Sequence, residues 1–249
     1  MRQLFIYIFL FGTISCNNPK QDKDMRKAGS QLEIKETLSI RLILPESLED
    51  RRHEFQNYIY AARKTIKSFS RKYCWRELTI DEFMDSVIIF DDKKKFNTAL
   101  LKIAGADTSI ILPDTYCAAL EKRTLISVSP EFYSKVYPEG IEERSFEKLL
   151  THEIAHQLHI RILKGNEEGM GPIWFYEGFA IYVADQFSDS DIVLSKKEIM
   201  EIMENPDRGS YIKYNYIFRY FTTKIPLKEL IVKAKNENFN EELIKLIQE

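Results

Sequence analysis

The sequence predicts an α+β fold, in which a small mixed sheet in the N-terminal half packs on a mainly helical C-terminal half. Short runs of β-branched residues bounded by charge or proline recur in the first half of the chain. From Ile141 onward, apolar residues recur at helical spacing instead. The 249 residues show no internal repeat, so we expect a single domain over residues 37–249.

The first sixteen residues, MRQLFIYIFLFGTISC, have the pattern of an export signal. Arg2 precedes an apolar run, Leu4–Phe11, that is too short to span a bilayer but suits a signal peptide. The ending TISC resembles a bacterial lipobox, in which the cysteine becomes the lipidated first residue, although Thr13 replaces the usual leucine. This resemblance implies an exported lipoprotein, anchored through Cys16 to the periplasmic or cell-surface side of a bacterial membrane. A secretory signal cleaved near Cys16 and an uncleaved anchor are the alternatives.

Residues 17–36 are polar and charged, and they predict a flexible tether. Ordered sequence is expected to begin near Thr37. In an exported protein, Cys74 and Cys117 could form a disulfide bridge, or they could be buried free thiols. No Cys-x-x-Cys or Cys–His cluster occurs, so cysteine is not expected to bind a metal.

The elements of the first half are predicted from periodicity and from their flanking residues. Leu38–Leu44 alternates and stops at Pro45, which predicts a strand. Ser47–Lys72 has apolar residues at helical spacing, which predicts a long amphipathic helix. A short helix is expected at 93–103, and further strands are expected at 87–90, 109–112 and 124–128.

The second half is predicted to be helical at 142–164, 173–187, 194–204, 211–223, 227–236 and 239–248. In the first of these helices, no glycine or proline interrupts residues 141–164, and Gly165 follows as a natural stop. Its apolar residues lie on several sides, which indicates a buried helix.

This helix carries three of the chain's four histidines, within the stretch THEIAHQLH. His152 and His156 are four residues apart, so they share one helix face and can converge on one metal ion. Glu153 lies between them, close enough to reach a water molecule at that ion. The alternative is an ordinary pair of hydrogen-bonded histidines. Burial of the helix favours the metal, because buried polar groups need partners.

The third ligand is less apparent. The pattern H-E-x-x-H-x-x-G-x-x-H fails, because His159 occupies the glycine position, so His159 is expected to pack or to support a ligand. Glu177 is the better candidate, since it lies in the aromatic stretch GPIWFYEGFAIYVAD, where an unpaired carboxylate is costly. Glu167 and Glu168 are rivals, but the glycine-rich loop around them indicates that both are solvated.

The H-E-x-x-H motif followed by W-F-Y-E-G-F-A resembles the gluzincin, or peptidase MA-like, zinc metallopeptidases over residues 145–185. The resemblance implies a zincin-like fold and one Zn²⁺ per chain, held by His152, His156 and Glu177. It also implies hydrolysis of a peptide or protein substrate, with Glu153 as general base and then general acid.

The family also places an oxyanion-stabilising tyrosine or histidine on a later helix. In GSYIKYNYIFRYF, Tyr211 fits best, ahead of Tyr214 and Tyr216. Substrates of the family extend along an edge strand upstream of the zinc helix, for which residues 109–112 or 124–128 are the candidates.

Other functions stay open at this point. The motifs are also compatible with a non-catalytic lipoprotein that binds a peptide or partner through a structural or degenerate zinc site, and with a zinc hydrolase that cleaves a non-peptide bond. Nucleic acid is not expected as a partner, because the formal net charge is −2 and the basic residues are spread along the chain.

Overall fold

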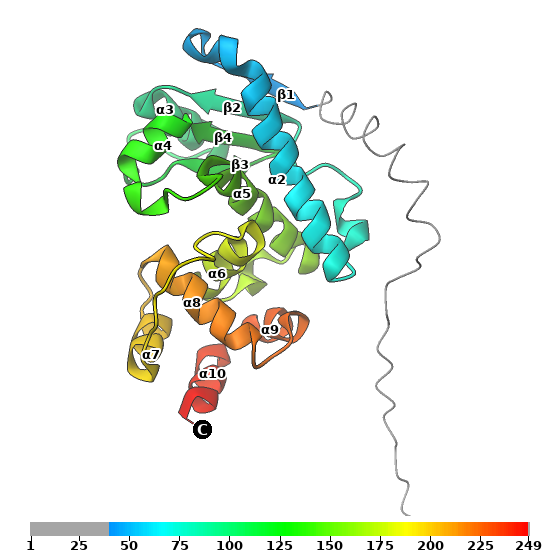
Figure 1. Cartoon of the computed structure of the whole chain (residues 1–249), viewed down its shortest axis with the longest axis vertical. Coiled ribbons are helices and arrows are strands. Elements are labelled where there is room, and N and C mark those ends of the chain that lie inside the picture. The colour runs from blue at the N-terminus through cyan, green and yellow to red at the C-terminus, as the bar shows by residue number, and fades with distance from the viewer. Residues whose placement is uncertain (1–39, 249) are drawn as a thin grey trace, which may run out of the picture. The chain divides into compact units, whose positions relative to one another are not determined.

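This computed structural model describes residues 40–248 of the chain. The N-terminal half of these residues contains a four-stranded sheet (Figure 1). The strand order is β1-β2-β4-β3, with both β1–β2 and β2–β4 parallel and β3–β4 antiparallel. The predicted small mixed sheet is therefore confirmed. The strands are β1 (Arg41–Ile43), β2 (Ser86–Phe90), β3 (Ala118–Glu121) and β4 (Thr124–Val128).

The hairpin from β3 to β4 is tight. Lys122 and Arg123 form its turn and have positive φ angles of 45° and 64°. Positive φ at both central residues is typical of the two-residue turn whose twist matches that of the flanking strands. This turn places β3 at the edge of the described sheet and β4 in its interior.

One expectation about this half is wrong, and one helix was not predicted. Residues 109–112 form no strand: Ile110 and Ile111 are 49% and 93% exposed. Ser129-Pro130 follows the strand β4 and begins the helix α4 (Pro130–Val136). The Ser129 hydroxyl accepts a hydrogen bond from the Phe132 amide, and proline is well suited to the first helical turn.

The remaining helices follow the predicted order with small shifts at their ends. The predicted helix 47–72 is divided into a short 3-10 helix, η1 (Glu46–Arg51), and α2 (Arg52–Lys72). Further 3-10 turns are η2 (Arg76–Thr79), η3 (Pro138–Gly140) and η4 (Glu167–Met170). The other helices are α3 (Lys93–Ala104), α5 (Ser145–Ile162), α6 (Ile173–Ala184), α7 (Lys196–Glu204), α8 (Tyr211–Thr222), α9 (Leu227–Ala234) and α10 (Phe239–Gln248).

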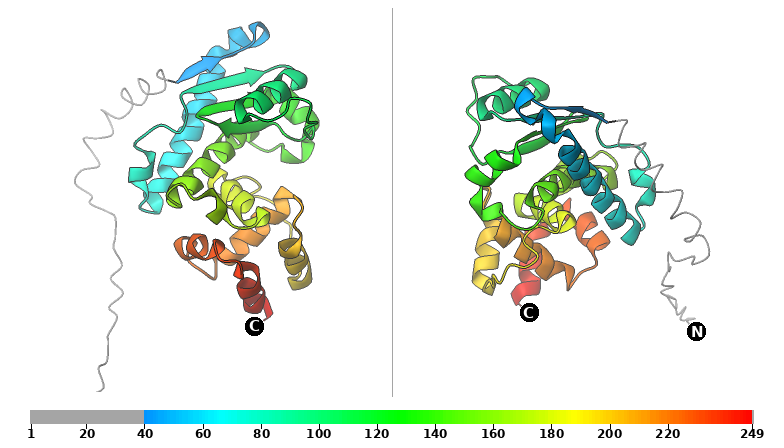
Figure 2. Two further views of the ribbon diagram at one scale, coloured as in Figure 1. Left: turned by 180° about the vertical axis from the view of Figure 1, so that it is seen from behind. Right: turned by 45° about the horizontal axis from the view of Figure 1, so that its top comes forward.

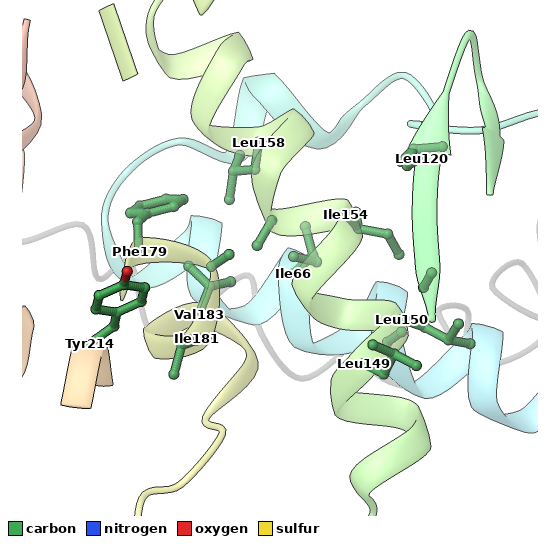
Figure 3. Close-up of a cluster of buried hydrophobic side chains, with 14 of the residues drawn as sticks. Ile66, Leu120, Leu149, Leu150, Ile154, Leu158, Phe179, Ile181, Val183 and Tyr214 are labelled. Carbon is green, nitrogen blue, oxygen red and sulfur yellow. The ribbon is translucent and has the colours of Figure 1, made fainter. Parts of the chain in front are cut away.

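Helix α5 lies at the centre of the fold, between the sheet and the pair α6 and α8 (Figures 1 and 2). Leu150, Ile154 and Leu158 are almost fully buried on it. They belong to the same core cluster as Ile66 of α2 and Phe179 of α6, and Figure 3 shows these side chains distributed along α5. The prediction of a buried helix is confirmed, and the core fixes the orientation of its histidines.

Helices α6 and α8 approach each other closely at Gly178. A Cβ atom at this position would lie 2.9 Å from the Cβ of Phe218, which is closer than real Cβ contacts. Glycine therefore sets the spacing between α6 and α8, directly beside Glu177.

Of the two possibilities left open for Cys74 and Cys117, the bridge between them does not form. Among the described residues, Cys117 is a free thiol that is 3% exposed. Its Sγ lies 4.0 Å from the Asp114 carbonyl oxygen, at the start of the edge strand. Burial raises the pKa of this thiol to about 11.

All described residues belong to one unit, Thr37–Glu249. The predicted signal peptide with Cys16, the predicted tether at 17–36 and the start of the first predicted strand lie outside the described residues. Within residues 40–248, none of the helices combines the length and the apolar character needed to cross a bilayer.

Candidate metal centre

Three side chains from α5 and α6 converge on one point. The Nε2 atoms of His152 and His156 are 3.0 Å apart, and Oε2 of Glu177 lies 3.1 Å and 3.7 Å from them, respectively. The group could hold a metal ion. The sequence-based ligand candidates are therefore brought together by the fold.

The spacing of these three atoms suits a small divalent cation. A tetrahedral ion with bonds of roughly 2.0–2.1 Å separates its ligand atoms by about 3.3 Å. The three observed separations lie on both sides of that value. Two imidazoles and a carboxylate form a donor set that zinc commonly accepts.

His152 is held from both sides. Its Nδ1 donates a hydrogen bond to Oε1 of Gln186 at 2.9 Å, so in the neutral ring the lone pair is on Nε2, the atom that faces Glu177. Gln186 follows the end of α6, where Asp185 has a left-handed φ of 54°. This turn is closed by a bond from the Gln186 amide to the Ile181 carbonyl at 3.0 Å.

The pKa shifts of Glu177 and His156 suit cation binding, whereas burial would lower the pKa of His152 but its contact with Glu177 raises it. Burial alone would raise the pKa of Glu177, but its hydrogen bond with His152 and the positive charges around it, including that of Arg208, lower the pKa to about 2. Burial lowers the pKa of His156 to about 4, so this ring is neutral at pH 7. A neutral imidazole and an ionised carboxylate are the forms that bind metals.

Glu153 lines the same cleft, one residue beyond His152 on α5. Burial raises its pKa to about 7, against the opposing effect of His152. A carboxyl group with a pKa near neutrality can both accept and donate a proton at physiological pH.

Among the three tyrosines considered from the sequence, Tyr211 lies at the centre. Its ring stacks on His152, with the centroids 5.6 Å apart and an interplanar angle of 16°. Burial raises its pKa well above the usual value, so the hydroxyl stays protonated. The hydroxyl of Tyr214 instead accepts a bond from the Gly209 amide at 2.5 Å, and Tyr216 packs against the core.

A cleft of about 990 Å³ opens over these residues. One wall is β3, so neither range expected to supply the edge strand does so: 109–112 is a loop and 124–128 lies inside the sheet. Glu167 and Glu168 line the cleft but are exposed, as their loop sequence indicated.

His159 is not part of the group of ligands. It is fully buried, and its ring packs on Phe179 at a centroid distance of 4.4 Å. Within the described residues, neither ring nitrogen has a hydrogen-bond partner. Of the two roles expected for His159, packing and support of a ligand, the structure shows packing.

Two residues of the site were missed in the sequence. Nη1 of Arg208 forms an ion pair with Oε1 of Glu177 at 2.9 Å, and Gln186 accepts a hydrogen bond from His152. Neither lies in a motif, and each is at least 31 residues from its partner (208 − 177 = 31; 186 − 152 = 34).

Comparisons with protein-family models, with curated protein sequences and with solved structures found no significant match to this chain.

Proposed function

We propose that this protein is a zinc-dependent metallopeptidase of the gluzincin type, with a zincin-like fold, that hydrolyses peptide bonds of peptide or protein substrates. The observation that carries the proposal is the convergence of His152, His156 and Glu177 in one cleft, with Glu153 on the same wall. His152 and His156 would bind the ion through Nε2, and Glu177 would bind through Oε2. When bound, zinc would polarise a carbonyl group and lower the pKa of a water molecule to about 7.

Glu153 supplies the proton transfers. It follows the ligand His152 directly and belongs to the cleft wall, where it can take a proton from the attacking water and pass it to the leaving amine. A pKa of about 7 suits both directions of transfer. General acid–base catalysis by such a group typically contributes ~10²–10⁴-fold.

Tyr211 donates a hydrogen bond to the oxygen that becomes negative during attack. Its position against His152 places the hydroxyl beside the ligands, and Arg208 keeps that hydroxyl in place through a bond of 2.7 Å. A donor held ready for developing charge is worth more than one that must reorient.

The substrate is proposed to lie along β3. Among the described strands, β3 pairs only with β4, so its other edge can pair with the main chain of an extended peptide. Ala118–Glu121 line the cleft, in reach of the same space as Glu153.

The proposed setting is the outer side of a bacterial membrane, with the lipid anchor on Cys16. Mass spectrometry of the mature protein from membranes tests this placement. A lipid-modified N-terminal cysteine is expected, and its loss in Cys16→Ala should release the protein or stall its processing. An unmodified N-terminus in the wild type would remove the anchor from the proposal.

Cleavage of a peptide library by the wild type and by Glu153→Gln, with zinc content measured on both, tests the activity. Because glutamine is nearly isosteric and Glu153 is not a ligand, zinc content and melting temperature should stay unchanged while hydrolysis falls by at least ~10². A wild type that holds zinc without cleaving any peptide would instead be a binding protein or act on another bond. A wild type that holds no zinc would refute the metal centre.

A further inference from the structure

Arg208 occupies an unusual position in the cleft. It lies in the segment NPDRGS between α7 and α8, and its side chain is 41% exposed. Among the described residues that line the cleft, it is the only lysine or arginine. Its guanidinium also lies 5.7 Å from the centroid of the Tyr116 ring, which lines the same cleft.

One nitrogen of Arg208 joins two functional groups. Nη1 forms an ion pair with Oε1 of Glu177 at 2.9 Å and donates a hydrogen bond to the hydroxyl of Tyr211 at 2.7 Å. The carboxylate of a ligand candidate and the hydroxyl of the proposed oxyanion donor are thus connected through a single charged group.

The contact with Arg208 gives the two oxygens of Glu177 different partners. Oε2 lies 3.1 Å and 3.7 Å from the Nε2 atoms of His152 and His156, respectively, whereas Oε1 is occupied by Arg208. Without the arginine, rotation of the carboxylate could present both oxygens to a cation. A catalytic zinc site keeps one position open beside three protein ligands, and a second carboxylate oxygen would occupy it.

The backbone holds Arg208 in place. The Gly209 amide donates to the hydroxyl of buried Tyr214 at 2.5 Å, and the Asp207 amide donates to the side chain of Asn205 at 2.9 Å. The residues on both sides of Arg208 are therefore fixed, so its side chain enters the cleft from a preorganised turn.

We propose that Arg208 is a positioning residue that restricts Glu177 to one metal-binding oxygen and couples this ligand to Tyr211. The inference rests on the proposed zinc site, but it is independent of which bond the protein cleaves. The same positive charge also repels a divalent cation, so the sign of its effect on zinc affinity separates positioning from competition.

The test compares the wild type with Arg208→Gln and Arg208→Lys. Arg219→Gln is the matched control, because Arg219 is 38% exposed and also binds a carboxylate, that of Asp185 at 3.0 Å, outside the cleft lining. The measurements are zinc affinity, by competition with a chromophoric chelator, and the visible absorption of the cobalt(II)-loaded protein, which reports coordination number. Melting curves establish that each variant is folded.

If Arg208 positions Glu177, Arg208→Gln should weaken zinc binding by about 10–100-fold, the usual cost of losing a group that orients a ligand. Its cobalt absorption should weaken, because a freed Oε1 raises the coordination number. Arg208→Lys retains a charged donor and should recover most of both losses, and the control should match the wild type.

Unchanged or tighter zinc binding in Arg208→Gln, with an unchanged cobalt spectrum, would overturn the inference while leaving the zinc site intact. Failure of the wild type and the control to bind either metal would overturn the zinc site and this inference together. If Arg208→Gln does not fold, Arg208→Lys provides the test, because lysine keeps a charged donor and should preserve most of the zinc affinity. A zinc affinity of Arg208→Lys as low as that of Glu177→Ala would contradict the inference.

Discussion

His152 and His159 lie seven residues apart on α5, which places them on the same helix face about two turns apart. Both are buried, at 3% and 0% exposure. The two nitrogens of His152 meet Gln186 and Glu177, whereas His159 meets the rings of Phe175 and Phe179. The two histidines thus share helix face and burial, and they differ in the partners that α6 and the turn after it supply. What makes a candidate site is the set of groups that neighbouring elements bring to the histidine.

The largest expected effect concerns the candidate metal ligands around His152. Glu177→Ala removes the only anionic group of the ligand set, so zinc content should fall from one ion per chain to near zero. Glu177→Gln keeps an oxygen donor without the charge and should lose less. Atomic absorption after dialysis measures both variants. Full occupancy in the alanine variant would show that α6 does not supply the third ligand.

For His159, the histidine that packs in the core, we expect an effect on how the stability of the protein depends on pH. Burial lowers the pKa of His159 to about 3, from 6.5 for an ordinary histidine. The unfolded chain therefore binds a proton at His159 below pH 6.5 that the folded chain does not bind until about pH 3, so stability is lost as the pH falls through this window. As the pH falls from 7 to 4.5, the unfolding free energy of His159→Leu should rise by about 2–3 kcal/mol relative to that of the wild type.

Denaturant titrations at the two pH values measure this change. The control is His53→Leu, at an exposed histidine of α2. A difference between wild type and His159→Leu that does not vary with pH would mean that His159 gains a partner, such as a buried water.

Substitution of Gly178, the residue after Glu177, should change the stability of the protein but not its zinc binding. Gly178→Ala places a Cβ atom 2.9 Å from the Cβ of Phe218, so α6 and α8 must separate. Overpacking of this kind typically costs about 1–3 kcal/mol. Thermal unfolding measures the loss, and zinc content should remain at one ion per chain. Loss of zinc at unchanged stability would link this helix contact to the metal centre instead.

The smallest effect concerns His159 at neutral pH. Leucine has a similar volume and removes two buried nitrogens that have no partner among the described residues. Removing such groups should raise the unfolding free energy by about 1 kcal/mol at pH 7, with zinc binding unchanged. A clear destabilisation, measured by urea unfolding, would show that His159 contributes more than packing.

The parts of the fold that were predictable depend on local pattern. Residues 145–162 form one helix because no glycine or proline interrupts them, and Thr124–Val128 forms a strand with the expected bounds. The strand β3 was missed because its sequence, AALE, has no β-branched residue. It is extended because the turn at Lys122 and Arg123 pairs it with β4.

The site shows the same limit. His152, Glu153 and His156 follow from spacing on one helix, and Glu177 followed from the cost of burying an unpaired carboxylate. Arg208 and Gln186 could not be found in this way, because their roles depend on how loops between helices return to α5 and α6. Long-range contacts of single polar residues leave no periodic signal.

The contacts of His152 require a fixed spacing along the chain between Glu177 and Gln186. Glu177 and Gln186, nine positions apart (186 − 177 = 9), hold the two nitrogens of one imidazole. One residue inserted between them would rotate everything after it by about 100° around the helix axis, so only one of the two could still reach the ring. The number of residues from Glu177 to Gln186, including the turn at Asp185 that follows α6, is therefore fixed by these two contacts.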